Sequence, residues 1–219
     1  MNNIRVFYKK MSRAKYISHL DITRCMQRAI KRAAVPVWYT EGFNPHIYMT
    51  FALPLSLGYE SECEVMDMRL IEDMPLCEVM DRLNKSLPPD ITVTDVKEQV
   101  NKPDAIVSAL YKVVLSADGV DGESLLRDFG EFMLTDTIEV EKKTKKGMKT
   151  VDIKPDCEII KIYAGKNSIV MRIKTAAGIE KNINPSLLTD EFAQRYKIEN
   201  IATTVLRKAI YMQDGQDFN

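Results

Sequence analysis

The stretch ECEVMDMRL, residues 62–70, alternates between polar and apolar side chains. Successive side chains of a strand point to opposite faces of a sheet, so this alternation predicts a β-strand. Downstream, residues 74–87 place Leu76, Val79, Met80 and Leu83 at helical spacing, and Pro88-Pro89 ends the helix. Residues 91–96 alternate again and predict a further strand.

Upstream of this strand, the pattern predicts three more elements before the segment 51–61, which Pro54 and Gly58 interrupt. Residues 4–8 alternate as a strand. Ser18 is a good helix N-cap, and the helix is expected to run to about residue 34, with an apolar stripe formed by Leu20, Ile22, Cys25, Met26, Ala29, Ile30 and Ala33. Residues 35–39 are predicted to form the second strand, and residues 47–51 follow in extended form. The resulting order, strand, helix, strand, strand, helix, strand, is that of the ferredoxin-like fold.

The second half of the chain repeats this order with one addition. Its expected elements are strand 110–117, helix 123–134, a hairpin of 137–142 with 150–153, a second hairpin of 158–163 with 168–175, helix 185–196 and strand 202–212. The prediction is an α+β protein of two tandem ferredoxin-like (βαββαβ) subdomains with antiparallel sheets, the second with an extra hairpin. Their expected bounds are 1–100 and 105–213, with a linker at 101–104 and a disordered DGQDFN tail.

Composition narrows the class of protein. Hydrophobic residues make up 45% of the chain and charged residues 28%, as in a soluble globular protein. No apolar run approaches the roughly 20 residues that span a bilayer, and no secretory signal is present, so no membrane association is expected. The four cysteines lie far apart, which suits a reducing cytoplasm rather than a disulfide framework or a structural zinc site. No cofactor-binding motif is present, and no cofactor is expected.

Charge is distributed unevenly although its formal total is zero. Residues 1–50 hold nine Lys and Arg against two acids, whereas residues 51–100 hold four against eleven acids. The basic segment is a candidate for phosphate contact, but folding can also bring the acidic segment beside it and cancel it. The sequence leaves both outcomes open.

Two dense polar stretches form the candidate site, SHLD at residues 18–21 and EGFNPH at residues 41–46. They hold the only two histidines, His19 and His46. If the start of the first helix and the loop reach one edge of the sheet, these imidazoles meet in a cluster shaped by Ser18, Asp21, Glu41, Gly42 and Pro45. Such a cluster suits general acid–base chemistry on a ribose hydroxyl, with His19 and His46 catalytic. It also suits metal binding, although no spacing rule requires it and no metal site is assigned. A tight turn between two strands is the plain structural alternative.

Basic and aromatic residues around these stretches indicate nucleic-acid binding. Arg24, Arg28 and Arg32 share one helix face without acids four residues away, and guanidinium groups match phosphate oxygens. Tyr39 and Phe43 are candidates to stack an unpaired base, with Asn44 beside them. A lysine-rich hairpin tip contributes Lys143, Lys145 and Lys146 as candidate contacts to an RNA backbone. A solvated helix face and a solvated hairpin tip are the plain alternatives.

The SHLD motif with its arginine helix, EGFNPH at 41–46 and FALPLSLGYESECE at 51–64 resemble a bacterial radical-SAM-linked domain of unknown function. This domain occurs alone or fused to cobalamin-binding-type radical-SAM proteins. The family pattern has a second proline after the histidine, where this chain has Ile47. The resemblance implies a radical-SAM protein as partner and a bacterial source. Tandem ferredoxin-like subdomains with such a loop are also similar in architecture to CRISPR repeat-processing endoribonucleases, which is an analogy of fold alone.

Together these observations favour an RNA-binding accessory module, for tRNA or rRNA, that works with a radical-SAM enzyme and is not catalytic by itself. The first alternative is a metal-independent RNA-processing or RNA-modifying enzyme that uses His19 and His46. The second is a metal-binding or protein-interaction adaptor. The sequence does not define the oligomeric state.

Overall fold

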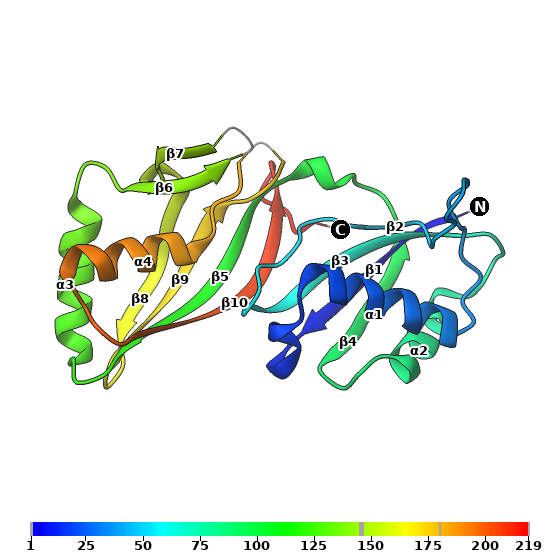
Figure 1. The fold of residues 1–219 in the computed structure, drawn as a ribbon, viewed down its shortest axis with the longest axis horizontal. Coiled ribbons are helices and arrows are strands. Elements are labelled where there is room, and N and C mark those ends of the chain that lie inside the picture. The colour runs from blue at the N-terminus through cyan, green and yellow to red at the C-terminus, as the bar shows by residue number, and fades with distance from the viewer. Residues whose placement is uncertain (1, 145–146, 180, 219) are drawn as a thin grey trace. The chain divides into compact units, whose positions relative to one another are not determined.

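The computed structural model describes residues 2–144, 147–179 and 181–218, and the side chains of residues 143 and 144 lie outside this description. The chain divides into two compact units (Figure 1). Unit 1 comprises Met1–Ala105 with Asp217–Asn219, and unit 2 comprises Ile106–Gln216.

Unit 1 has the ferredoxin-like order that the sequence predicts. Its elements are β1 (Asn2–Lys10), the short 3-10 helix η1 (Ser12–Tyr16), α1 (His19–Arg32), β2 (Met49–Phe51), β3 (Glu60–Leu70), α2 (Leu76–Ser86), β4 (Ile91–Glu98) and η2 (Pro103–Ala105). Within the unit, the strands lie in the order β4-β1-β3-β2, and every neighbouring pair is antiparallel. This is the strand order in which two βαβ halves interleave on one sheet.

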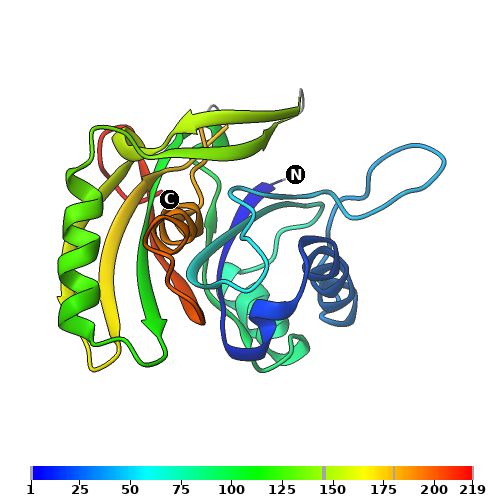
Figure 2. The same cartoon turned by 60° about the vertical axis from the view of Figure 1, so that its left-hand side comes forward.

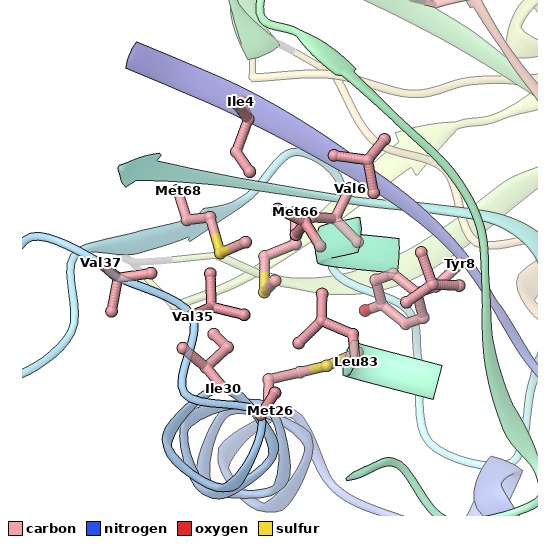
Figure 3. Packing of buried hydrophobic residues seen from close by; sticks show 14 of the residues in the cluster. Ile4, Val6, Tyr8, Met26, Ile30, Val35, Val37, Met66, Met68 and Leu83 are labelled. Atoms are coloured by element: carbon pink, nitrogen blue, oxygen red, sulfur yellow. The ribbon is translucent and has the colours of Figure 1, made fainter. Parts of the chain in front are cut away.

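The core of unit 1 lies between one face of this sheet and its two helices (Figure 3). Ile4, Val6 and Tyr8 of β1 pack beside Met66 and Met68 of β3. Helix α1 faces them with Ile22, Met26, Ala29 and Ile30, and α2 with Val79 and Leu83. These helix positions recur every three or four residues, which explains why the periodicity of the sequence located both helices.

The second strand of unit 1 is less regular than expected. Residues 35–39 form no continuous strand, and only isolated bridges join Val37 to Leu70 and Tyr39 to Ile47. Regular pairing with β3 resumes at Met49. The residues between are therefore an excursion from the sheet edge, and Figure 2 shows it as the long light-blue loop that projects from unit 1. Leu20 is a further correction, because its side chain is 58% exposed rather than part of the core stripe.

Unit 2 repeats the same topology. Its elements are β5 (Ile106–Ala117), α3 (Gly122–Leu134), β6 (Glu139–Thr144), β7 (Gly147–Asp152), η3 (Lys154–Asp156), β8 (Cys157–Ala164), β9 (Ser168–Ala176), α4 (Pro185–Tyr196) and β10 (Ile201–Met212). The main strands lie in the antiparallel order β10-β5-β9-β8. The extra hairpin that the sequence predicts is present as the β6-β7 pair, between α3 and β8. The α+β fold prediction is confirmed.

A glycine fixes how closely α3 of unit 2 begins against the β8-β9 turn. A Cβ atom at Gly122 would lie 1.8 Å from the carbonyl oxygen of Gly165, so no larger residue fits without movement of the backbone. The amide of Gly122 also donates a hydrogen bond to the Lys166 carbonyl, at 3.0 Å. Helix α3 is capped by Asp121, whose carboxylate accepts from two amides of the first turn.

The expectation of a disordered tail is wrong for the described residues of the C-terminus. Met212 donates a backbone hydrogen bond to Gln216, and Phe218 is only 4% exposed. The ring of Phe218 lies 4.2 Å from the guanidinium carbon of Arg5, a cation–π contact that ties the tail to unit 1. Across the described residues, the helices are too short and too polar for any of them to cross a membrane.

Candidate nucleic-acid interface

Helix α1 begins at SHLD with a compact capping arrangement. Ser18 accepts a hydrogen bond from the Asp21 amide at 3.2 Å and donates one to the Asp21 carboxylate at 2.7 Å. Asp21 in turn accepts from Arg24 at 3.3 Å. The Ser18 hydroxyl, helped by Arg24, holds the pKa of Asp21 below its usual value. SHLD is therefore first of all a helix cap that keeps a carboxylate charged at the start of α1.

The cationic face of α1 is exposed, but its members differ in their contacts. The side chains of Arg24, Arg28, Lys31 and Arg32 are all exposed. Arg24 pairs with Asp21, and Arg32 donates to the Ser86 carbonyl at the end of α2, at 2.6 Å. Arg28 forms no hydrogen bond or ion pair with the described part of the chain. The predicted arginine row thus offers Arg24 and Arg28 to solvent, while Arg32 also stabilises the end of α2.

The EGFNPH loop is closed at its base by Thr40 and His46. The Thr40 amide donates to the His46 carbonyl at 2.8 Å, and the His46 amide donates to the Thr40 hydroxyl at 3.2 Å. The His46 Nδ1 atom lies 3.0 Å from Thr40 Oγ1 and 3.2 Å from the Asn44 carbonyl oxygen. His46 therefore fixes the loop through both its backbone and its ring.

Everything between these two residues is exposed. Phe43 is fully exposed, at 106% of its reference area, although a free phenyl ring in water is unfavourable. Gly42 has φ +122°, a conformation that favours glycine and that turns the chain just before this ring. Glu41, Asn44 and Pro45 are exposed as well. The loop therefore presents a rigidly based aromatic tip flanked by polar groups.

The loop stands beside one end of α1. The Lys31 ammonium lies 5.9 Å from the centre of the Tyr39 ring, and Tyr39 is 40% exposed. This contact joins the cationic helix face to the base of the aromatic loop. The cationic face of α1 and the aromatic loop thus meet at Lys31 and Tyr39. We call the two together the α1–loop surface and define it by Arg24, Arg28, Lys31, Tyr39 and Phe43.

The structure does not bring the two histidines together. His19, at the start of α1, packs edge-on against Phe51, with ring centres 5.1 Å apart. Lys31, which marks the base of the loop, lies about 18 Å further along the helix axis. Among the described residues, the contacts of His46 are with Thr40 and Asn44. SHLD and EGFNPH therefore contact the rest of unit 1 near opposite ends of α1 rather than at one place.

A stack of three side chains supports the loop base and was not predicted. Trp38 and Tyr48 meet edge to face with ring centres 5.4 Å apart, and the Arg69 guanidinium lies 5.1 Å and 5.3 Å from them. Asn3 accepts a hydrogen bond from Arg69 at 2.9 Å and so fixes the guanidinium. Trp38 is the only Trp of the chain and lies next to the loop, so it was a sequence feature from which this stack could have been suspected.

The acidic segment cancels only part of the basic segment. Arg5 pairs with Asp67, and Arg13 lies 3.6 Å from Asp90. No ion pair in the described ranges joins Arg28 or Lys31 of α1 to an acid of residues 51–100. The α1–loop surface therefore keeps the charges of Arg28 and Lys31, while Arg24 pairs with Asp21.

Two other predicted features fall outside this surface. In the described ranges, no group of three or more His, Cys, Asp or Glu side chains is placed to hold a metal ion. The lysine-rich hairpin forms as predicted, but the side chain of Lys143, and Lys145 and Lys146 altogether, lie outside the described residues. Lys142, next to them, donates to the Asn182 carbonyl at 2.5 Å.

Fold and surface define this chain as an α+β protein of two ferredoxin-like units, with a basic and aromatic surface on the first. Residues 3–185 match a bacterial family described as "Uncharacterized protein conserved in bacteria (DUF2344)". Since this match covers most of the chain, the protein belongs to that family. No functionally curated protein matches its sequence.

Two solved structures are similar to this protein at low sequence identity. A chain of "Crystal Structure of a Cbf5-Nop10-Gar1 Complex" is 10% identical, with a TM-score of 0.48, over 94% of this protein and 48% of that chain. This protein thus spans about half the length of that chain. "Crystal Structure of an Unknown Protein from Galdieria sulphuraria" is 11% identical, with a TM-score of 0.28, over 94% of this protein and 98% of that chain. At these scores neither likeness bears on function.

Proposed function

We propose that this protein is an RNA-binding accessory module, for a tRNA or rRNA element, that works with a radical-SAM enzyme in the cytoplasm. The observation that carries the RNA part is the α1–loop surface. There a fully exposed phenyl ring at Phe43 stands on a closed loop whose base, at Tyr39, contacts Lys31 of the cationic face of α1. Aromatic rings that stack unpaired bases, next to cations that contact phosphates, are the usual means of RNA recognition.

Each member of the surface then has a role. Arg24 and Arg28 contact backbone phosphates, with Lys31 beside them, and Phe43 stacks on an unpaired base with Tyr39 at the loop base. Arg32 contributes charge from its position against α2. Thr40 and His46 close the base of the loop that carries Phe43, which limits the freedom that the loop backbone loses when RNA binds.

The partner and the location rest on other observations. SHLD and GFNPH are the motifs that resemble the radical-SAM-linked domain. Tyr16 and Leu57 are 69% and 64% exposed, and a hydrogen bond from the Gly58 amide to the Lys15 carbonyl brings their segments together. Exposed apolar side chains near one another favour a protein contact there. All four cysteines are free thiols, which suits a reducing compartment.

The test is a titration of total tRNA at two salt concentrations. We expect binding that weakens with salt, and an Arg24→Gln/Arg28→Gln variant whose log–log salt slope is smaller by roughly 2, about one unit per lost phosphate contact. Phe43→Ala should cost about 1–3 kcal/mol through lost stacking. Tyr16→Ala, which removes another exposed ring, 69% exposed and outside the surface, is the matched control. No binding at low salt, or a Phe43→Ala variant that binds as the parent does, would refute the proposal.

General acid–base chemistry on RNA by His46 is a second candidate function. The contacts of Nδ1 with Thr40 and Asn44 orient this imidazole and leave Nε2 for a substrate. His19 has no part in this version, since it packs against Phe51. Cleavage or modification of tRNA by the parent that a His46→Ala variant retains in full would eliminate this candidate.

A further inference from the structure

Three cations lie side by side on the sheet of unit 2, on the face away from its helices. Lys112 of β5 is directly opposite Arg172 of β9, and Arg172 is directly opposite Lys161 of β8. All three side chains are exposed. Together with Tyr163 and Val170 they line a hollow of about 200 Å³. We call these three residues the basic row.

This arrangement is unfavourable for the protein alone. Side chains directly opposite on antiparallel strands have Cβ atoms only about 5 Å apart, and like charges at that distance destabilise the sheet. In the ranges that the structure describes, none of the three forms an ion pair. Beyond Lys112 the next strand places Leu206, which brings no charge. The basic row therefore carries three positive charges that an anion would stabilise.

The two rows of cross-strand neighbours on either side of the basic row differ in chemistry. On one side Lys174 is directly opposite Glu158, so that its charge has a partner close by. On the other side Val114, Val170 and Tyr163 stand in register and give an apolar surface. Tyr163 is 49% exposed, and the Lys161 ammonium lies 6.0 Å from its ring centre. A ligand with an anionic group attached to a flat apolar group therefore fits here. The anionic group would lie on the basic row and the flat group on the neighbouring row that contains Tyr163.

We propose that the basic row binds the backbone phosphate of a single-stranded RNA segment, and that Tyr163 stacks on the adjacent base. The Arg172 guanidinium offers a fork that matches two phosphate oxygens, and Lys112 and Lys161 add charge on either side. A ferredoxin-like sheet with stacking aromatic residues on its open face is a known geometry for single-stranded RNA. This site is separate from the α1–loop surface and does not depend on the function proposed for it.

The experiment measures binding of a fluorescent eight-nucleotide oligouridylate RNA to the full chain by anisotropy at low salt. Lys112→Gln/Arg172→Gln should bind at least about tenfold more weakly, because charge-assisted contacts to phosphate are lost. The matched control is Arg127→Gln/Lys197→Gln, which removes the same charge at exposed positions of α3 and of the α4 C-terminus. It should bind within about twofold of the parent, since these positions lie outside the basic row and the exposed ion pair of Arg127 with Asp128 contributes little.

Two further measurements distinguish RNA binding with base stacking from a general charge effect and from binding of free phosphate. Tyr163→Ala should weaken binding about fivefold or more, and Tyr163→Phe should not, because both Tyr and Phe stack. Equal weakening in the charge control and the basic-row variant would overturn the proposal. So would displacement of the oligonucleotide by inorganic phosphate below about 1 mM, which would assign the row to free phosphate. Arg24→Gln/Arg28→Gln reports on the α1–loop surface alone, so the failure of either site is visible separately.

Discussion

The two units place opposite chemistry on equivalent pairs of strands of the same fold. In unit 1 the first and third strands of the ferredoxin-like order pair Arg5 with Asp67. In unit 2 the corresponding strands pair Lys112 with Arg172. Both pairs are directly opposite one another on the face of the sheet that lies away from the helices. One pair attracts and the other repels.

The surroundings of the two pairs match this difference. Arg5 is 0% and Asp67 4% exposed, and their side chains meet twice, at 2.7 Å and 2.9 Å. The Asn101 carbonyl accepts a hydrogen bond from Arg5, and the Gln99 side chain donates one to Asp67. The Phe218 ring covers the guanidinium. The pair in unit 2 is open to solvent. A buried charge needs its partner, whereas exposed like charges are tolerated and stay available to a ligand.

The largest expected effect comes from removing one partner of the buried pair. Asp67→Ala should destabilise the protein by about 3–5 kcal/mol, because the Arg5 charge then stays buried without its carboxylate. Urea unfolding followed by circular dichroism measures this loss. Arg172→Ala is the counterpart in unit 2 and should not destabilise. A cost below about 1 kcal/mol for Asp67→Ala would show that the two pairs do not differ as described.

An intermediate effect is expected at the capped start of α1. Ser18→Ala should cost about 1 kcal/mol, since the Asp21 amide loses its acceptor. It should also raise the pKa of Asp21, because the Ser18 hydroxyl is the main cause of its lowered value. A lowered carboxylate pKa adds stability above the unfolded pKa and loses it as pH falls through the folded pKa. The difference between parent and variant should therefore shrink in acid.

Carboxylate NMR titration gives the pKa, and urea unfolding at pH 7 and at acid pH gives the stability difference. Ser124→Ala is the control, since Ser124 is in the first turn of α3 but Asp121 caps that helix. An unchanged Asp21 pKa in Ser18→Ala would contradict the assignment of its cause.

Many helices and strands could be predicted from the sequence because they depend on local periodicity. Alternation located β1, β3 and β4, and recurring apolar positions located α1 and α2. Residues 35–39 were less predictable, since Tyr39 pairs across the loop with Ile47 while Val37 pairs with Leu70. Leu20 fits a core stripe by sequence, yet it lies in the first turn of α1, where it is exposed.

The candidate sites were harder to predict from local sequence patterns than the helices and strands. The composition around Phe43 and Asn44 predicted a loop, and the structure has a loop at this position. Which charges cancel depends on pairing between strands far apart in the sequence. Arg5 and Asp67 are separated by 62 residues, and between the strands of Lys112 and Arg172 the chain forms α3, the β6-β7 hairpin, η3 and β8. No local pattern reveals such registers, so the basic row was found only in the structure.

The smallest expected effect reverses the sign of the repelling pair. Lys112→Glu places a carboxylate opposite Arg172 and should stabilise the protein by about 0.2–1 kcal/mol, the range for cross-strand charge pairs. Lys112→Gln should give a smaller gain, and both gains should fall at 1 M NaCl, where charges are screened within about 3 Å. Urea unfolding at low and high salt measures them, with Lys197→Glu as the control for net charge. A loss of stability in Lys112→Glu at low salt would mean that the like charges of the basic row cost the sheet nothing, and that the contrast with Arg5 and Asp67 lies in burial alone.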